Sequence, residues 1–341
     1  MTKGAGIAVL ALVAALATAC SAGTPGRSTT TTAGTGFAGV PRGVSGTAHV
    51  AYAGSLQLEN ESIVGPKFES VTGASYQGRG AGSLGLAHEL LSGTITADVF
   101  ESVGAKPIEM LEPRLTTWYA QFASSPLVIA YNPKGRFAST FEKVASGEKP
   151  LADAFEAMAE PGFHLGRTNP ETDPQGQAFI EMVELAQKSL GLRTGIVGEI
   201  LGGTENPAQI FAETALDAHL QAGQLDAASA YLPQAVEKHL PYVSLPSSID
   251  LGDPSRAPEY ATASVVLPDG TTVHGAPITI DVTTLSAPGT SRRAAVAFVA
   301  FVLSSDGRKL MEEGGYTLVP VKLFGRLSMV PQALREVVPA S

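Results

Sequence analysis

The chain has 341 residues, 44% of them hydrophobic, and a formal net charge of −9 at pH 7. This length is enough for two packed lobes, and the composition is that of a folded protein. The acidic balance, with no stripe of Lys and Arg, excludes a nucleic-acid-binding surface, because phosphate recognition needs clustered basic side chains.

The N-terminus has the pattern of an export signal. Lys3 precedes an unbroken apolar run over residues 7–17, and small residues then lead to the only cysteine, Cys20. The run is shorter than the roughly 20 apolar residues of a membrane span and is typical of a signal peptide. The segment resembles the lipobox of bacterial lipoproteins, whose cysteine is lipidated; an ordinary secretory signal with a free cysteine is the alternative.

We therefore expect a signal peptide over residues 1–19 and a lipid anchor on Cys20, which would place the protein outside the cytoplasm, attached to the cell membrane. Residues 20–45, rich in Ser, Thr, Gly and Pro, cannot bury enough apolar area to order themselves, and we expect a flexible tether there.

The remaining sequence alternates predicted strands and helices. Strands are expected over residues 47–53, 75–78, 97–102, 127–130 and 163–168, and a hairpin over 264–273 around Pro268-Asp269-Gly270. Helices are expected up to about residue 70, up to about residue 91, and over 174–190, 211–222 and 291–313, the last broken near residue 306. This alternation predicts an α/β protein with a parallel sheet.

Two Gly-Ser pairs stand where a predicted strand gives way to a predicted helix. Ser55 follows Gly54, and Ser83 follows Gly82. A helix N-terminus offers free N–H groups and a partial positive charge, and a serine adds a hydroxyl donor, so two such turns could bind an oxyanion without any formal positive charge. The alternative is that both serines are ordinary helix N-caps.

Other motifs are weaker. Residues 80–85 match GxGxxG, but the strand before them is polar, and the candidate ribose-binding acids, Asp98 and Glu101, lie slightly before or near the expected window. The same segment is one glycine short of a GxSxG nucleophile elbow, and the late histidine of a hydrolase would have to be His274, in the predicted hairpin. The six histidines show no metal-binding spacing, so surface histidines are expected.

The order of many short motifs resembles the tungstate/molybdate-binding proteins of ABC importers, which have the type II periplasmic-binding-protein fold. The similarity runs from about residue 49 to 325, with departures around Ser83 and over 192–210. Its landmarks are residues 53–56, 81–84, 97–99, 169–176, 212–213, 220–226, Tyr242, 245–246, 249–252, Gly275, Pro277 and 319–320.

The resemblance implies two lobes with a ligand cleft between them. Lobe 1 would comprise residues 46–125 plus 283–341 and lobe 2 residues 126–282, with the strand at 127–130 crossing the hinge and a strand near 278–282 returning. It also implies that Ser55 and Ser83 bind the ligand.

The same resemblance implies a specific role for Asp173 and Glu213. From the residues alone, Asp173 is an N-cap and Glu213 a solvated helix residue, and carboxylates repel an oxyanion. In the family, an Asp and a Glu at these places approach the metal centre of the oxyanion, since tungsten and molybdenum are hard Lewis acids that accept further oxygen ligands. Tyr231 corresponds to a ligand-contacting tyrosine in related proteins; otherwise it is a half-buried strand residue.

The sequence therefore predicts a monomeric solute-binding protein without cofactor or catalysis, which captures tungstate or molybdate for an ABC permease. A receptor of the same fold for sulfate, thiosulfate, phosphate or a ferric complex is one alternative, and an extracytoplasmic hydrolase is another. No residue distinguishes tungstate from molybdate.

Overall fold

The computed structural model describes residues 37–286, 291–335 and 337–338. The predicted signal peptide, Cys20 and the first part of the predicted tether lie outside these residues. Within the described ranges, no helix is both long and apolar enough to cross a membrane.

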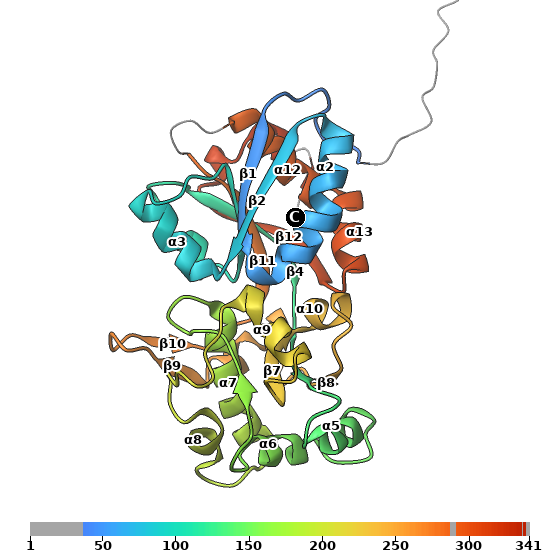
Figure 1. The fold of residues 1–341 in the computed structure, drawn as a ribbon. Helices are drawn as coiled ribbons and strands as arrows, with labels where there is room; N and C mark the ends of the chain where they lie inside the picture. Colours follow the sequence, from blue (N-terminus) through green and yellow to red (C-terminus); the bar gives the residue numbers. More distant parts are fainter. Residues whose placement is uncertain (1–36, 287–290, 336, 339–341) are drawn as a thin grey trace, which may run out of the picture. The chain divides into compact units, whose positions relative to one another are not determined.

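The described chain forms two main sheets, each with its own helices, and a separate two-stranded hairpin (Figure 1). The larger sheet draws on both ends of the chain, drawn in blue and red, whereas the smaller one uses the middle, drawn in green and yellow. The larger sheet has the order β12-β4-β11-β3-β1-β2. Its strands are β1 (Thr47–Ala53), β2 (Ser75–Ala81), β3 (Val99–Val103), β4 (Trp118–Ser124), β11 (Thr279–Thr284) and β12 (Thr317–Gly325).

The prediction of a parallel sheet is wrong for three of the five strand pairings in the larger sheet. β1 pairs in parallel with β2 and β3, but β11 is antiparallel to both β3 and β4, and β12 is antiparallel to β4. The sheet is mixed because β11 and β12 return from the far end of the chain. Neither β4 nor β12 is among the predicted strands.

Helices cover both faces of the larger sheet, as β1 illustrates. Val50 and Tyr52 belong to the core cluster that contains Phe298 of α12, while Ala51 between them packs with Leu86 of α3. Alternate residues of a strand point to opposite faces, so a strand covered on both faces is apolar throughout. The helical segments of this lobe are η1 (Gly54–Leu56), α1 (Gln57–Glu59), the π-helix η2 (Asn60–Val64), α2 (Gly65–Thr72), α3 (Ser83–Ser92), α4 (Lys106–Glu109), α12 (Arg292–Leu303), α13 (Ser305–Glu313), η4 (Leu327–Met329) and α14 (Gln332–Arg335).

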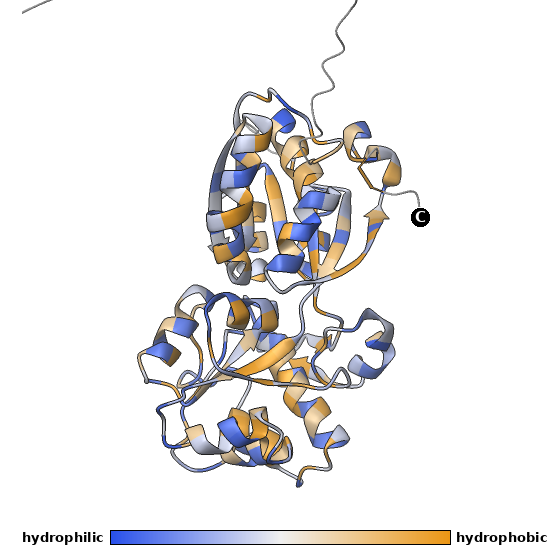
Figure 2. Ribbon diagram, turned by 90° about the vertical axis from the view of Figure 1, so that its right-hand side faces the viewer, coloured by the Kyte–Doolittle hydropathy of each residue, from blue (hydrophilic) through white to orange (hydrophobic). Residues whose placement is uncertain are grey.

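The smaller sheet has the order β6-β7-β5-β8. β7 is antiparallel to β5 and parallel to β6. In Figure 2 the strands are mostly coloured hydrophobic, whereas many helices carry both colours, as expected of helices with one face in solvent. The elements are β5 (Leu127–Tyr131), β6 (Leu165–Gly166), β7 (Ala227–Tyr231), β8 (Tyr242–Ser244), α5 (Ala138–Ala145), α6 (Ala152–Met158), α7 (Pro174–Ser189), α8 (Ile196–Leu201), α9 (Glu213–Gln221), α10 (Leu232–Glu237), η3 (Pro254–Arg256) and α11 (Ala257–Tyr260).

Several predicted elements are confirmed with shifted ends. The predicted hairpin forms from β9 (Ser264–Val266) and β10 (Thr272–His274), which pair antiparallel. The helix predicted over 174–190 is α7, and that predicted over 291–313 is α12 and α13, broken at Ser304. The strand predicted over 163–168 shrinks to the two residues of β6.

The predicted tether extends too far. Phe37, Val40 and Val44, within the expected tether, are buried, and the ring of Phe37 stacks on Phe301 at 4.6 Å. The Phe37 N–H donates to the Asp306 carboxylate at 2.6 Å. Three apolar residues spaced through a polar segment are enough to pack it onto α12, so the folded part begins by residue 37.

Candidate functional site

The pairing of β1 with β2 places the two Gly-Ser turns side by side. The parallel register matches Ala53, the last residue of β1, with Ala81, the last residue of β2. Ser55 and Ser83 therefore follow adjacent strands, which lie about 5 Å apart, at the same carboxyl edge of the sheet. The carboxyl ends of strands in α/β sheets are the usual place for a ligand.

Neither serine is a helix N-cap. The N-cap of α3 is Gly82 and that of η1 is Ala53, and neither helix start has a side-chain capping bond. Both serines are buried, and the Ser83 hydroxyl oxygen accepts the Val103 N–H at 3.2 Å, which leaves its own proton free to donate. The capping alternative is wrong: the Ser83 hydroxyl still has its proton to donate, and the Ser55 hydroxyl faces the Glu213 carboxyl.

The two predicted carboxylates belong to the other lobe and meet these turns. The Ser55 N–H donates to Glu213 Oε1 at 2.7 Å. A Cβ added at Gly54 would lie 2.5 Å from Glu213 Oε2, and one at Gly82 would lie 3.1 Å from Asp173 Cβ. Only glycine allows this approach at either turn.

Asp173 and Glu213 both lie at the start of a helix. Asp173 is the N-cap of α7, where its carboxylate accepts the Gln175 N–H at 2.8 Å, as predicted. Glu213 is the first residue of α9 and is 5% exposed, so the expectation of a solvated helix residue is wrong. The N-termini of η1, α3, α7 and α9 thus contribute residues to one cluster, where their dipoles favour negative charge.

Burial makes the two carboxyls hold protons more tightly than usual. It raises the pKa of Asp173 to about 6, although the Gln175 N–H opposes the rise. Burial and then the charge of Asp173 raise the pKa of Glu213 well above its usual range, against the donors of Ser55 and Gly54. Two carboxyls in contact share a proton in this way, so the site carries less negative charge than two carboxylates would bring.

Tyr231 completes the group. It is the last residue of β7 and 1% exposed, rather than half-buried as its strand position suggests. Burial, followed by the charges of Asp173 and Glu213, raises the pKa of its phenol well above the usual value. Within the described residues its hydroxyl has no hydrogen-bond partner, so it is a buried donor beside the two carboxyls.

A series of hydrogen-bonded, buried polar side chains fixes the start of α7, and the sequence analysis did not predict it. Ser229 donates to Gln175 Oε1 at 3.0 Å, and the Gln175 amide donates to Gln234 Oε1 at 3.2 Å. Gln234 donates in turn to Asp217 at 3.0 Å. These residues hold the start of α7 against β7 and α10. Their spacing along the sequence follows no pattern that would predict these hydrogen bonds.

A cavity of about 970 Å³ adjoins this cluster rather than containing it. Tyr231, Leu84, Thr172 and Pro174 line it, whereas Ser55, Ser83, Asp173 and Glu213 do not, because these four are buried against one another. The cavity reaches the cluster at Tyr231 and at the chain neighbours of Ser83 and Asp173.

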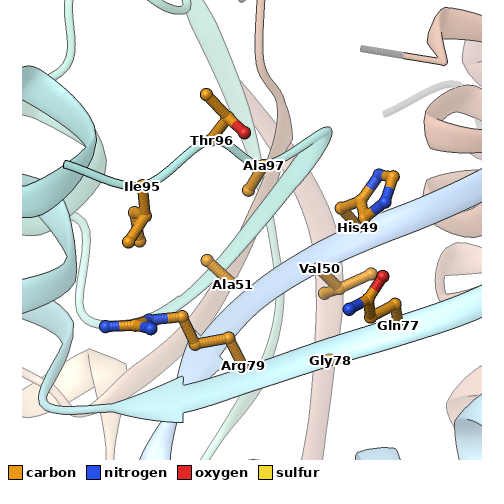
Figure 3. A pocket seen from close by; sticks show the side chains of 9 residues that line it. All are labelled: His49, Val50, Ala51, Gln77, Gly78, Arg79, Ile95, Thr96 and Ala97. Carbon is orange, nitrogen blue, oxygen red and sulfur yellow. The ribbon is translucent and has the colours of Figure 1, made fainter. Parts of the chain in front are cut away.

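A second cavity of about 210 Å³ lies beside β1 and β2 (Figure 3). His49 and Arg79 line it, but His49 Nδ1 already contacts Asp98 Oδ2 at 2.7 Å, and Arg79 pairs with Glu89 at 2.8 Å. Because its basic side chains are already paired with acids, this cavity is a poor anion site.

Comparisons with known proteins agree with the geometry. A Haloferax volcanii protein whose name describes a molybdenum-binding protein of an ABC transporter is 38% identical over 174 residues, 51% of this chain and 53% of that protein. The molybdate/tungstate-binding protein WtpA of Pyrococcus abyssi is 27% identical over 316 residues, covering 85% of this chain and 89% of its own. The structure of the Azotobacter vinelandii periplasmic molybdate-binding protein superposes with a TM-score of 0.55 at 16% identity, covering 80% of this chain and 99% of that one.

Fold and site define a two-lobed α/β binding protein of the periplasmic type, with its polar cluster where the lobes touch. The chain belongs to the bacterial extracellular solute-binding protein family, whose model matches residues 48–317.

Proposed function

We propose that this protein captures tungstate or molybdate outside the cytoplasm and delivers it to an ABC permease. The observation that carries the proposal is the contact of two buried carboxyls, Asp173 and Glu213, with the Gly54-Ser55 and Gly82-Ser83 turns. The names of the relatives from Haloferax and Pyrococcus point to the same ligands.

The turns supply what any oxyanion needs. The hydroxyls of Ser55 and Ser83, the N–H groups of their turns and the phenol of Tyr231 are donors, and the N-termini of η1 and α3 add positive potential. That Ser55 already donates to a carboxylate oxygen supports its role as an anion donor. A hydrogen bond to a charged group contributes about 1.5–3 kcal/mol.

The carboxyls supply selectivity. Oxygen donors suit a hard metal centre such as tungsten or molybdenum, which accepts further oxygen ligands, whereas the sulfur of sulfate and the phosphorus of phosphate do not. Asp173 and Glu213 would therefore bind the metal centre of the right anion and repel the commoner ones.

The protein acts by binding, without catalysis or cofactor. The lobes close over the anion, and the permease recognises the closed form. We also propose that Cys20 carries a lipid anchor, that residues from 20 up to the start of the folded part near residue 37 form the tether, and that the protein acts as a monomer on the outer side of the cell membrane.

Calorimetric titration of tungstate, molybdate, sulfate and phosphate into the wild type, Asp173→Asn and Glu213→Gln tests the function. If the carboxyls coordinate the metal centre, both variants lose affinity for tungstate and gain affinity for sulfate, because sulfate has no such bond to lose. If the carboxyls only line the site, both variants bind every anion more tightly. Tighter tungstate binding would favour a receptor for sulfate or phosphate.

A further inference from the structure

A second pair of acidic side chains, one from each lobe, lies apart from Asp173 and Glu213. Glu59 ends α1 in the lobe of the larger sheet, and Glu237 ends α10, which packs on β5 and β7 of the other lobe. Their carboxyls are neighbours, and the charge of Glu59 acts on Glu237. Both also border Gly314, where an added Cβ would lie 2.5 Å from Glu59 Oε2 and 3.2 Å from Glu237 Oε1. We call Glu59 and Glu237 the interlobe acid pair.

The pair has no other source of hydrogen bonds. Glu59 is fully buried and Glu237 half-buried. Within the described residues, none of the four carboxyl oxygens accepts a hydrogen bond from an N–H or O–H group of any other residue. Two ionised carboxylates in contact repel each other, whereas one proton between them turns the contact into a hydrogen bond.

The surroundings do not neutralise the pair. Glu313 of α13 and Glu101 of β3 lie near Glu59, and both would add negative charge. Tyr316 approaches from the start of β12 with a buried hydroxyl. Lys238 follows Glu237, but its ammonium pairs with Asp217.

This setting favours the protonated form. Burial, against the contact with Glu237, raises the pKa of Glu59 to about 7. Burial and then the charge of Glu59 raise the pKa of Glu237 to about 8. Gly314, which has no side chain, leaves the room that lets the two carboxyls meet.

We propose that the interlobe acid pair holds one proton while the lobes touch, so that closing the lobes takes up a proton and opening them releases it. Glu59 and Glu237 are then positioning residues for the closed form and not ligands of the anion.

The direction of the pH dependence follows from the sign of the shift. The folded pKa of each acid lies above its value in the unfolded chain, so the native protein binds more protons than the unfolded chain between about pH 4.5 and 8. The contribution of the contact is fully present below pH 4.5 and is lost as the pH rises to about 8. If the protein binds an oxyanion as proposed, capture is favoured on the acidic side and release on the alkaline side; the proton linkage itself does not depend on that function.

Glu59→Gln separates a shared proton from ordinary packing. An amide has nearly the shape of the carboxyl and donates an N–H to Glu237 at every pH, so the variant should keep the contact without a titrating proton. We would measure denaturant unfolding of the full chain between pH 5 and 8.5, without any oxyanion, and small-angle X-ray scattering at both ends of the range. Asp173 and Glu213 are present in both proteins, so the difference between the two profiles reports the loss of the Glu59 carboxyl, including its effect on the neighbouring Glu101.

The wild type should lose roughly 100- to 1,000-fold more in its folding equilibrium than Glu59→Gln across this range, since the two pKa values lie about two to three units above pH 5 and each unit is a factor of ten. Scattering should show the wild type expanding at pH 8.5 and the variant unchanged. Parallel pH profiles of wild type and variant would overturn the proposal. So would a wild-type profile that calcium or a chelator shifts, because a cation would then join the two acids.

If Glu59→Gln does not fold, Glu237→Gln makes the same comparison at the less buried partner. The experiment contains no oxyanion, so its outcome is independent of the proposed function. Parallel pH profiles would refute the shared proton without refuting tungstate binding, and a protein that binds no tungstate could still show the shared proton.

Discussion

The close approach of Glu213 to Gly54 predicts that the single methyl group added in Gly54→Ala weakens tungstate binding. In Gly54→Ala, the new Cβ would lie 2.5 Å from Glu213 Oε2 and 3.0 Å from its Cδ. Ordinary contacts of this kind are about 3.4 Å or longer, so the carboxylate has to move by roughly 1 Å. The present bond of 2.7 Å between the Ser55 N–H and Oε1 would then exceed hydrogen-bonding distance.

Gly54→Ala should weaken tungstate binding without destabilising the fold. The displaced atoms are the end of a flexible side chain, so the fold can adapt, and we expect little change in melting temperature. The methyl group, however, also keeps an anion oxygen from the Ser55 N–H. Loss of one hydrogen bond to a charged group, about 1.5–3 kcal/mol, weakens tungstate binding roughly 10- to 150-fold.

Gly85→Ala is the matched control. Gly85 also faces the other lobe, yet its added Cβ would lie 3.6 Å from Thr172 Cβ and 3.7 Å from Thr172 O, which are ordinary contacts. Isothermal calorimetry with tungstate should find wild-type affinity in this variant. Wild-type affinity in Gly54→Ala, or equal losses in both variants, would refute the proposed geometry.

Three further predictions follow from single residues. Ser55→Ala and Ser83→Ala should each weaken tungstate binding roughly 10- to 100-fold by calorimetry. Ser55→Ala should change the melting temperature little, since its hydroxyl caps no helix, whereas Ser83→Ala should also lower it, because the buried Val103 N–H loses its acceptor; unchanged affinity in either variant would contradict this. Cys20→Ser should move the protein from the membrane fraction to the medium on cell fractionation. A mature N-terminus at another residue, found by mass spectrometry, would contradict the lipid anchor on Cys20. Asp173→Asn should lose less stability than wild type between pH 4 and 7 in urea unfolding, because burial raises the pKa of Asp173 to about 6 and the native state gives up that proton as the pH rises; identical slopes would argue against the shift.

The sequence predicts best where chemistry is local. Asp173 before Pro174 is a helix start in almost any setting, and it is the N-cap of α7. The Pro268-Asp269-Gly270 turn likewise forms its hairpin. The order of landmarks along the chain, rather than any one motif, predicted the fold.

Pairing between distant segments could not be predicted in the same way. β12 and β4 join the sheet only because residues about 200 positions apart meet, and no local pattern encodes that register. The same limit hides the contact of Glu59 with Glu237 and that of Gly54 with Glu213, since each joins the two lobes. Serines before a helix look like caps until the structure shows that glycine or alanine takes the cap position.

The most direct test of the central claim is X-ray absorption spectroscopy at the tungsten edge of the tungstate complex. If Asp173 and Glu213 bind the metal centre, the wild-type complex should show about six oxygen neighbours, and Asp173→Asn should show fewer. A tetrahedral spectrum in the wild type, identical to that of free tungstate, would contradict the account.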